Sequence, residues 1–381
     1  MNRPAELPAE ARTRFALTVP PLPADLATPC VVVDLDVVAR NIERLARGAR
    51  DRGVALRPHV KTHKSVALAR MQLDAGAAGI TVGTVGEAEV MAAGGIDDIF
   101  IAYPVWAEGA RAERLAAVHG AVTLSVGIDS VEGAERLARA VGGSGRPLTV
   151  LVEVDSGGRR TGIADPAEVV RVAAAARSAG LHVAGAFTHG GHSYRNPEAR
   201  ISAAADEVAA LGAAADALGD AGYVVERVSA GSTPTGVLAA AGQVNEIRPG
   251  TYLLGDRLQL ALGAIPADGL ALVVAATVVS TAVPGQVVVD AGAKTLTKDR
   301  ASFLEGFGLL PAYPDAVIER LFDYHGAIAI PPETAAPSLG EVVAILPNHV
   351  CPVVDLFDTF VATRAGQIVG HWPVDARGRS G

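Results

Sequence analysis

The hydrophobic pattern of the chain changes about two thirds of the way along. After residue 28, short runs rich in Val, Ile and Leu alternate with Ala-, Leu-, Glu- and Arg-rich segments of helical period. This alternation predicts parallel strands joined by helices. The predicted strands begin at eight positions: Val54, Gly79, Asp98, Ala121, Leu148, His182, Val224 and Val244.

Eight strand–helix repeats over roughly 210 residues predict a (β/α)8 barrel, the TIM-type member of the α/β class. A doubly wound open sheet is the competing interpretation. It more often uses five or six strands, and its G-x-G-x-x-G signature does not follow the first predicted strand.

The pattern after about residue 265 predicts a mostly antiparallel β domain. Runs such as ALVVAATVVST, GQVVVDAG and EVVAIL are separated by Pro and Gly turns, without long helices between them. The run PCVVVDLD near residue 30 either joins this domain or leads into the barrel. We therefore expect a barrel over residues 35–262, and a β domain formed by residues 1–34 together with 263–381.

The length, charge and cysteine content of the chain limit which binding partners and which cellular compartment we expect. A length of 381 residues exceeds what one core usually holds, and a net charge of -8 disfavours nucleic acid or an anionic membrane as partner. No stretch is long and apolar enough to span a bilayer, and the polar N-terminus lacks the apolar region of a signal peptide. Two cysteines, Cys30 and Cys351, cannot form a disulfide framework, so we expect a reducing cytoplasm.

Chemically active residues gather just after the predicted strands, where such barrels carry their sites. Reactive side chains, glycines and hydroxyls recur in five segments of this kind: 57–64 (RPHVKTHK), 155–162 (DSGGRRTG), 188–194 (THGGHSY), 229–236 (SAGSTPTG) and 246–252 (EIRPGTY).

Lys61 is the first candidate nucleophile. A lysine at a strand end in a barrel mouth is desolvated, which lowers the amine pKa and favours attack on a carbonyl. Most lone lysines are simply solvated loop residues. Lysine is scarce in this chain, however, and Lys61 and Lys64 both fall within R-P-H-V-K-T-H-K.

A second cluster predicts a phosphate site. Gly231, Ser232 and Thr233 follow a predicted strand, so that backbone N–H groups and hydroxyls can converge on an anion. Alone, such a cluster is usually an ordinary loop. The nearby turn R248-P-G-T251 makes a phosphate cradle the better interpretation.

Two sets of residues are candidate metal ligands. His59, His63, His189 and His192 are compatible with a barrel metallohydrolase, although acidic ligands are not evident nearby and buried core histidines are the plain alternative. In P347-N-H-V-C351, His349 and Cys351 would face the same side of a strand and suit zinc with open coordination positions. By spacing alone, H-x-C also occurs by chance.

As an ordered set, these motifs resemble the D-threonine aldolase / D-serine dehydratase family of fold-type III pyridoxal-phosphate enzymes, related to alanine racemase. The motifs are R-P-H-V-K-T-H-K, D-S-G-G-R-R-T-G, S-x-G-S-T-P-T, E-I-R-P-G-T-Y, D290-A-G-A-K294 and P-N-H-V-C. The match runs from about residue 27 to W-P-V-x-A-R-G-R near the end. It implies a barrel with a C-terminal β domain, a homodimer and a small D-amino acid substrate.

The resemblance also implies roles for individual residues. Lys61 would carry the cofactor as a Schiff base. His59, Arg160 and His189 join Lys61 as candidate catalytic residues, with Arg160 near the phenolic oxygen and His189 at the face of the ring. Arg248 would contact the pyridine nitrogen, and Tyr194 would reach the cofactor or substrate. The phosphate would lie against five residues: Gly231, Ser232, Thr233, Gly250 and Thr251.

His349 and Cys351 match the metal pair of the family. Dehydratases of the family resemble H-x-C with zinc, whereas aldolases carry H-x-D with manganese or a similar ion. We expect zinc, with manganese or magnesium as alternatives. The chain departs from the family at Asp355, where relatives often have Asn, and at Asp323-Tyr324, where they often have Glu-Glu. If these positions line the pocket, the substrate is neither serine nor threonine.

The expected function is therefore a metal-assisted dehydratase that converts a D-β-hydroxy-α-amino acid into a 2-oxo acid and ammonia. A retro-aldolase giving glycine and an aldehyde is the alternative in the same site. An amino-acid racemase, a non-catalytic pyridoxal-phosphate carrier and the barrel metallohydrolase are the remaining alternatives.

Overall fold

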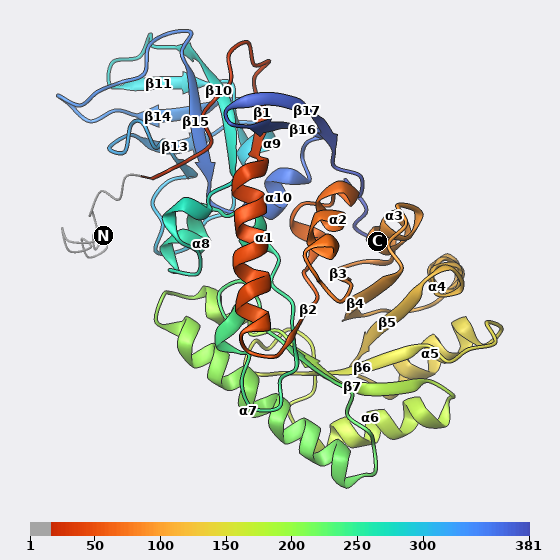
Figure 1. The fold of residues 1–381 in the computed structure, drawn as a ribbon. Coiled ribbons are helices and arrows are strands. Elements are labelled where there is room, and N and C mark those ends of the chain that lie inside the picture. Colours follow the sequence, from red (N-terminus) through yellow and green to blue (C-terminus); the bar gives the residue numbers. More distant parts are fainter. Residues whose placement is uncertain (1–16) are drawn as a thin grey trace.

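A computed structural model describes residues 17–381 and contains two sheets. One sheet has eight strands and forms the barrel, and the other has nine. In Figure 1 the barrel lies below, coloured orange to green, and the other sheet lies above it, mostly cyan and blue. The polar N-terminus and residues 1–16 of the expected β domain lie outside the described residues. No helix within residues 17–381 has both the length and the apolarity needed to cross a membrane.

The eight parallel strands predicted from the hydrophobic pattern are present in the expected order. The last strand pairs with the first, and the barrel closes between the first and second through the His59–Thr81 bridge and the hydrogen bond from Thr81 N to Pro58 O (2.8 Å). This confirms the predicted fold class. The strands are β2 (Ala55–Leu56), β3 (Ile80–Val82), β4 (Asp98–Pro104), β5 (Thr123–Ile128), β6 (Thr149–Val154), β7 (His182–Thr188), β8 (Arg227–Ala230) and β9 (Glu246–Ile247).

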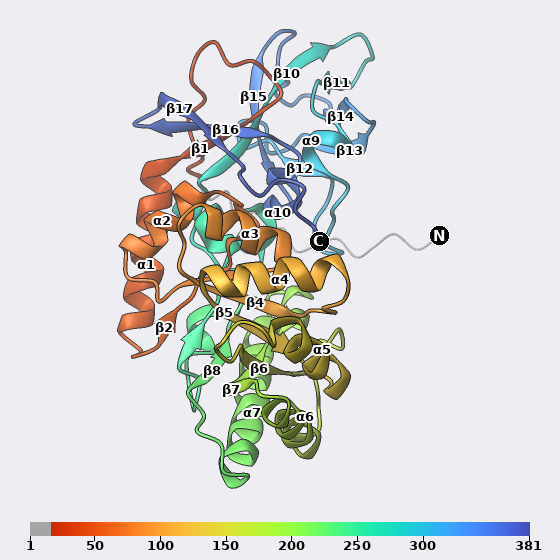
Figure 2. The same cartoon turned by 90° about the vertical axis from the view of Figure 1, so that its right-hand side faces the viewer.

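Helices on the outside of the barrel connect most of these strands (Figure 2). Capping residues define where these helices begin. Before the helix that begins at Pro166, for example, Asp165 accepts a hydrogen bond from Ala167 N, and Pro166 occupies the first turn. Between β8 and β9 the chain forms only a single 3-10 turn, η4 (Gly236–Leu238). The helices are α2 (Val66–Asp74), α3 (Val85–Ala93), α4 (Ala110–Ala121), α5 (Val131–Val141), α6 (Pro166–Ser178) and α7 (Ala199–Asp220).

The second sheet is antiparallel except where β1 (Cys30–Asp34) pairs with β16. The run near residue 30 therefore joins the β domain. Helix α1 (Leu35–Arg50) then descends from this sheet toward the barrel (Figure 1). The other strands are β10 (Leu272–Ser280), β11 (Gln286–Val289), β12 (Gly308–Leu309), β13 (Val317–Leu321), β14 (Gly326–Ala329), β15 (Val342–Pro347), β16 (Thr359–Arg364) and β17 (Gln367–Pro373), with short helices α8 (Arg257–Ala261), α9 (Ala293–Leu296) and α10 (Val350–Val354).

The barrel interior combines an aromatic pair with a buried ionic network. Phe100 and Phe187 pack edge to face, with ring centroids 5.1 Å apart. Arg57 Nε donates to Glu246 at 2.8 Å, and both side chains are almost fully buried. Burial raises the pKa of Glu246, but the charges of Arg57 and Arg227 outweigh burial and hold that pKa below its usual value, so the carboxylate is ionised.

We expect Arg57→Met to lower the free energy of unfolding by about 3–5 kcal/mol, because Glu246 loses its hydrogen-bonded cation and keeps only Arg227, whose Nη1 lies 3.9 Å away. Chemical denaturation followed by circular dichroism measures this change. Arg50→Met is the matched control, because Arg50 pairs with Glu43 on the exposed face of α1 and such pairs contribute only about 0–1 kcal/mol. Equal effects of the two substitutions would contradict a buried ionic role for Arg57.

Candidate active site

Lys61 lies in the short 3-10 helix η2 (Val60–Thr62), between β2 and α2 at the C-terminal end of the barrel. Its side chain is exposed at the opening. The turn after β9 packs closely against this helix: a Cβ on Gly250 would lie 2.6 Å from His59 O and 3.0 Å from Thr62 Oγ1. Glycine is therefore required at position 250, and the lysine turn and the expected phosphate turn are in direct contact.

His59 and His189 are brought together beside Lys61. Burial, followed by the charge of Lys61, lowers the pKa of both rings, and the pKa of His189 falls to about 3. Arg160 and Arg248 contribute in the same direction. Both imidazoles are consequently neutral at ordinary pH, and the site has a positive potential suited to an anionic cofactor or substrate.

Arg248 is buried and held by neighbouring strands. Its Nε donates to Ser229 Oγ at 2.9 Å, and its Nη2 donates to Thr188 O. Ser229 Oγ in turn donates to Glu246 at 2.7 Å, so Arg248 is connected to the ionic network of the barrel interior.

The expected phosphate loop follows β8. Gly231 has a φ of 76°, in the left-handed region, and a Cβ there would lie 3.1 Å from Gly236 O. Ser232 N donates to Thr235 Oγ1 at 2.8 Å, and Thr233 Oγ1 accepts from Tyr252 N at 3.1 Å, which ties this loop to the turn containing Thr251. Crowded glycines and paired hydroxyl turns next to a lysine are a donor set that fits pyridoxal phosphate.

Tyr194 ends the 3-10 helix η3 (Gly191–Tyr194) and reaches the same region. Its ring centroid lies 6.3 Å from that of His189. Burial, with the charges of Cys351 and Asp256, raises the pKa of its hydroxyl, whereas a hydrogen bond with Ser232 lowers it. The phenol is therefore protonated and lies between the phosphate loop and the metal pair.

Arg160 and His189 line a cavity of about 160 Å³ at the end of β6. Glu153 forms another wall: its Oε1 accepts from Thr161 Oγ1 at 2.8 Å and lies 4.0 Å from Arg160 Nη2. Glu153 Oε2 is buried without a hydrogen-bond partner. The Arg160 side chain itself is exposed, so it borders the opening.

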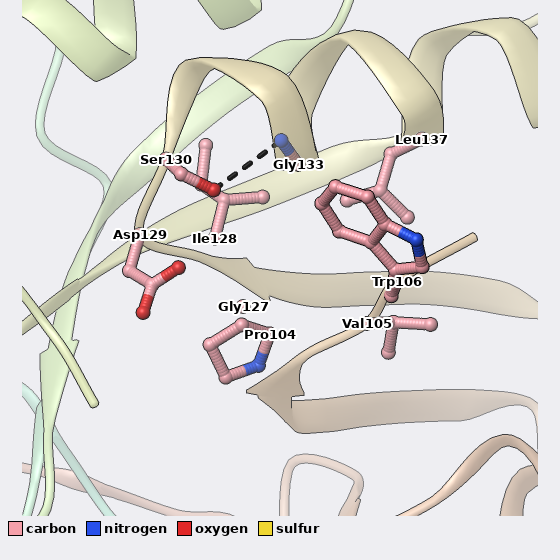
Figure 3. A pocket seen from close by; sticks show the side chains of 9 residues that line it. All are labelled: Pro104, Val105, Trp106, Gly127, Ile128, Asp129, Ser130, Gly133 and Leu137. Atoms are coloured by element: carbon pink, nitrogen blue, oxygen red, sulfur yellow. Dashed lines mark hydrogen bonds between the residues drawn. The ribbon is translucent and has the colours of Figure 1, made fainter. Parts of the chain in front are cut away.

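A second, smaller cavity of about 80 Å³ lies at the ends of β4 and β5 (Figure 3). Its walls include Trp106, Leu137 and Asp129, with Ser130 capping α5 through Gly133 N at 3.3 Å. None of the residues expected to be catalytic lines it.

The expected metal ligands, His349 and Cys351, do not lie on a strand, which corrects the sequence-based placement of the pair. Strand β15 ends at Pro347; His349 is extended and precedes α10, and Cys351 lies in the first turn of that helix. Asp256 explains the helix start, because its buried Oδ2 accepts from Val350 N at 3.0 Å. Pro352, which is compatible with a first helical turn and not with a central strand, is the sequence signal for it.

The histidine and the thiol nevertheless lie together beside the lysine turn. Cys351 Sγ lies 3.2 Å from Thr62 Oγ1 and 3.7 Å from Thr251 Oγ1. Burial raises the pKa of Cys351, but His349, Lys61 and Thr62 outweigh burial and lower it. A thiol with a lowered pKa beside an imidazole fits a divalent metal ion.

Asp299 is a site residue that the sequence motifs did not indicate. Its Oδ2 lies 2.7 Å from His349 Nδ1, the arrangement that orients metal-binding histidines through a carboxylate. Burial lowers the pKa of His349, but Cys351, Asp256 and Asp299 together raise it to about 9. No local pattern links Asp299 to His349, because 50 residues separate them.

Glu207 was also missed. It is buried on α7, and its Oε1 accepts from Gly190 N at 2.8 Å, directly after His189. In the sequence Glu207 lies within an Ala-rich helical segment, where no motif distinguishes it from the solvent-exposed glutamates of a helix.

The alternative histidine cluster does not have the geometry of a metal site. His63 is satisfied by Gln72 Oε1 at 3.2 Å and by Ser65 N at 3.1 Å, and His192 pairs with Asp206 at 3.0 Å. Within residues 17–381, no three His, Cys, Asp or Glu side chains are grouped so as to hold one ion.

The two departures from the family pattern do not line the cavity of this chain. Asp355 Oδ1 lies 2.7 Å from Lys64 Nζ. Asp323 and Tyr324 are exposed on the β domain and contact Lys294 at 3.3 Å and 3.0 Å. The cavity of about 160 Å³ is not lined by Lys61, His349 or Cys351 either, so an effect of these departures on the substrate stays a prediction.

Comparisons with known proteins agree with this architecture. The model of the alanine racemase N-terminal domain matches residues 33–258, and that of a putative serine dehydratase domain matches residues 271–363. A D-threo-3-hydroxyaspartate dehydratase of Delftia sp. is 34% identical, over 91% of this chain and 97% of its own length. A D-threonine aldolase of Arthrobacter sp. is 32% identical, over 96% and 98%.

Solved structures give the same result. The crystal structure of D-threonine aldolase from Filomicrobium marinum has a TM-score of 0.87 and 33% identity, covering 96% of this chain and 100% of that one. The Delftia enzyme has also been solved as a His→Ala variant and as a Cys→Ala variant two positions further on, the latter described as the metal-free form.

Proposed function

The chain belongs to the family of fold-type III pyridoxal-phosphate enzymes that joins an alanine racemase N-terminal domain to a serine dehydratase domain. On that premise we propose that it is a metal-assisted lyase that removes water from D-β-hydroxy-α-amino acids. The products are a 2-oxo acid and ammonia. The 3.2 Å contact between Cys351 Sγ and Thr62 Oγ1 carries the proposal, because Thr62 directly follows Lys61. Lys61 also lies close enough to Cys351 for its charge to lower the pKa of the thiol, so the candidate base and the candidate metal ligand are neighbours.

In this proposal Lys61 holds pyridoxal phosphate covalently through Nζ. Arg160 would lie near the phenolic oxygen and His189 at the face of the ring, while Arg248 would contact the pyridine nitrogen and Tyr194 the cofactor or substrate. When bound, the cofactor ring draws electrons from the substrate Cα and makes its proton more acidic. The phosphate is held by the two turns that contact each other through Tyr252: Gly231, Ser232, Thr233, Gly250 and Thr251.

Lys61 and the two neighbouring histidines would have different roles in the elimination. Lys61 Nζ, when it is not joined to the cofactor, would be the base for the Cα proton of the substrate. Burial and the surrounding cations lower the pKa of the nearby His59 and His189 imidazoles, so protonation of either ring is unfavourable and both are poor acceptors of that proton. His59 Nδ1 also accepts from Lys61 N at 3.4 Å and helps to orient the lysine turn.

His349 and Cys351 would hold the divalent ion, which would place it to orient the β-hydroxyl. The ion supplies Lewis acidity at that oxygen when bound. Thiolate and imidazole ligands favour zinc, with manganese or magnesium as the harder alternatives. Asp299 engages His349 Nδ1 and leaves Nε2 for the metal. The metal-free Cys→Ala form of the Delftia dehydratase, with its histidine at the same two-residue spacing, supports this assignment.

A retro-aldolase is the second candidate. It is favoured by the likeness to the Filomicrobium and Arthrobacter D-threonine aldolases. In that reaction a base removes the β-hydroxyl proton and the Cα–Cβ bond breaks, giving glycine and an aldehyde. The thiolate in the metal pair and the proximity of Lys61 favour the dehydratase.

Product analysis distinguishes the two reactions. We expect the purified protein with pyridoxal phosphate and Zn²⁺ to convert D-serine to pyruvate and D-threonine to 2-oxobutyrate, each with equimolar ammonia and without glycine. The enantiomers L-serine and L-threonine are the controls and should not react. Glycine with acetaldehyde from D-threonine would replace the dehydratase by the aldolase.

We also propose that the working unit is a homodimer in the cytoplasm. The family resemblance supports the homodimer. Large apolar side chains exposed on the β domain, including Phe322 and Leu339, offer surface for a second copy.

A further inference from the structure

Lys64, three residues after Lys61, is a buried lysine with no part in the chemistry described above. Its Nζ lies 2.7 Å from Asp355 Oδ1 and 3.5 Å from Glu87 Oε1. Its backbone has a φ of 51°, in the left-handed region that side chains other than glycine rarely adopt. Such a conformation persists where surrounding contacts determine it, and it is found preferentially at functional sites.

Asp355 connects this lysine to the metal-binding helix. It is the C-cap residue of α10, directly after Val354, and lies four positions after Cys351, about one helical turn away. Its Oδ1 accepts from Lys64 Nζ and also from Gly378 N at 3.0 Å. One carboxylate oxygen thus joins the end of α10, the lysine turn and the C-terminal segment.

The C-terminal segment completes the connection from the other side. Ala376 N donates to Lys64 O at 3.0 Å, and Asp375 Oδ2 accepts from Val66 N at 2.7 Å. Asp375 thereby caps α2, whose own N-cap residue, Ser65, makes no side-chain cap hydrogen bond. The chain terminus lies beside α3 in Figures 1 and 2.

Glu87 anchors the same cluster to the barrel. Its Oε2 accepts from Gly83 N at 2.7 Å, directly after β3, while Oε1 faces Lys64. Lys64 is therefore fixed to the barrel through Glu87 and to the β domain through Asp355.

We propose that Lys64 and Asp355 are a pair of positioning residues that holds α10 against the lysine turn and so sets the distance between Lys61 Nζ and the metal pair. This inference rests on the proposed function, since it needs a metal at His349 and Cys351. Without the pair, Cys351 remains on α10, but the helix loses its polar anchor to the lysine turn and the two ligands are less well arranged for one ion.

The test uses metal binding rather than turnover. Protein carrying pyridoxal phosphate is stripped of metal and titrated with Co²⁺, and the thiolate-to-metal absorption band is followed. The variants are Lys64→Gly, Asp355→Ala, their combination and Asp355→Asn. Glycine adopts a φ of 51° without strain, so Lys64→Gly removes the ammonium and keeps the turn.

We expect each of Lys64→Gly and Asp355→Ala to weaken Co²⁺ binding by about tenfold or more, the size typical of lost outer-shell support. The double variant should weaken Co²⁺ binding by less than the product of the two single effects, because both substitutions remove the Lys64–Asp355 contact. Asp355→Asn keeps an oxygen that can accept from Lys64 Nζ and Gly378 N. Its affinity for Co²⁺ should therefore lie between that of Asp355→Ala and that of the parent. Asp268→Ala, which breaks an ion pair with Arg44 on α1, is the control and should bind as the parent does.

Two results overturn the inference in distinguishable ways. If the parent shows the thiolate band and the single variants bind Co²⁺ as tightly as the parent, the positioning role is wrong while the metal pair stands. If the parent shows no thiolate band with Co²⁺, the metal pair of the proposed function fails, and the positioning role fails with it.

Discussion

Lys61→Ala is expected to lower kcat for D-serine by about 10⁴-fold or more, the upper end of what a general base alone contributes. The substitution removes both the covalent attachment of pyridoxal phosphate and the amine that takes the Cα proton. Steady-state ammonia release measures the rate, and the absorption spectrum of the purified protein reports the attachment. We expect the variant to lack the yellow absorption of the parent.

Lys61→Arg separates charge from nucleophilicity. Arginine keeps a cation beside His59 and His189, whose pKa values depend on it, but it cannot be deprotonated to form the linkage. It should therefore be as inactive as Lys61→Ala. An active or yellow variant of either kind would contradict the assignment of Lys61.

Cys351→Ala has the second largest expected effect. Loss of the thiolate leaves His349 as the remaining ligand of the pair, so the metal should dissociate. Lewis acid stabilisation of a leaving oxygen contributes several kcal/mol. About 4 kcal/mol corresponds to roughly a thousandfold in rate, so we expect kcat for D-serine to fall about that far. Metal analysis of the dialysed variant checks whether the ion has dissociated. A chelator should reproduce the loss of activity in the parent protein.

Cys30→Ala is the matched control, since Cys30 is the other thiol of the chain and lies on β1. Burial raises the pKa of Cys30 to about 11, so it is not a thiolate at ordinary pH. Cys351→Asp offers a harder ligand and should recover part of the activity with Mn²⁺ rather than Zn²⁺. Full activity of a metal-free Cys351→Ala variant would rule out the metal in the reaction.

Much of the fold follows from local patterns in the sequence. The strand beginning at Asp98 was predicted from DIFIAY, and β4 covers Asp98–Pro104. The strand expected at His182 is likewise β7. Buried parallel strands give continuous β-branched runs, and the helices between them follow a 3.6-residue period, so both signals are strong. The domain limits at residues 35 and 262 stay predictions.

The site is harder to predict because its parts meet only through tertiary contacts. The loops carrying Lys61, His189 and Gly231 could be placed at one end of the barrel, because parallel strands all end there. Nothing local shows that Asp299 contacts His349 or that Asp355 contacts Lys64, which lie 50 and 291 positions apart. The H-x-C pair was assigned to a strand because its spacing suits one.

Chemical trapping of the cofactor tests the central claim most directly. The parent protein, saturated with pyridoxal phosphate, is reduced with borohydride and digested, and the modified peptide is identified by mass spectrometry. We expect a phosphopyridoxyl group on Lys61 and not on Lys64, which is three residues away and paired with Asp355. A phosphopyridoxyl group on another lysine instead, or no modified lysine at all, would contradict this claim.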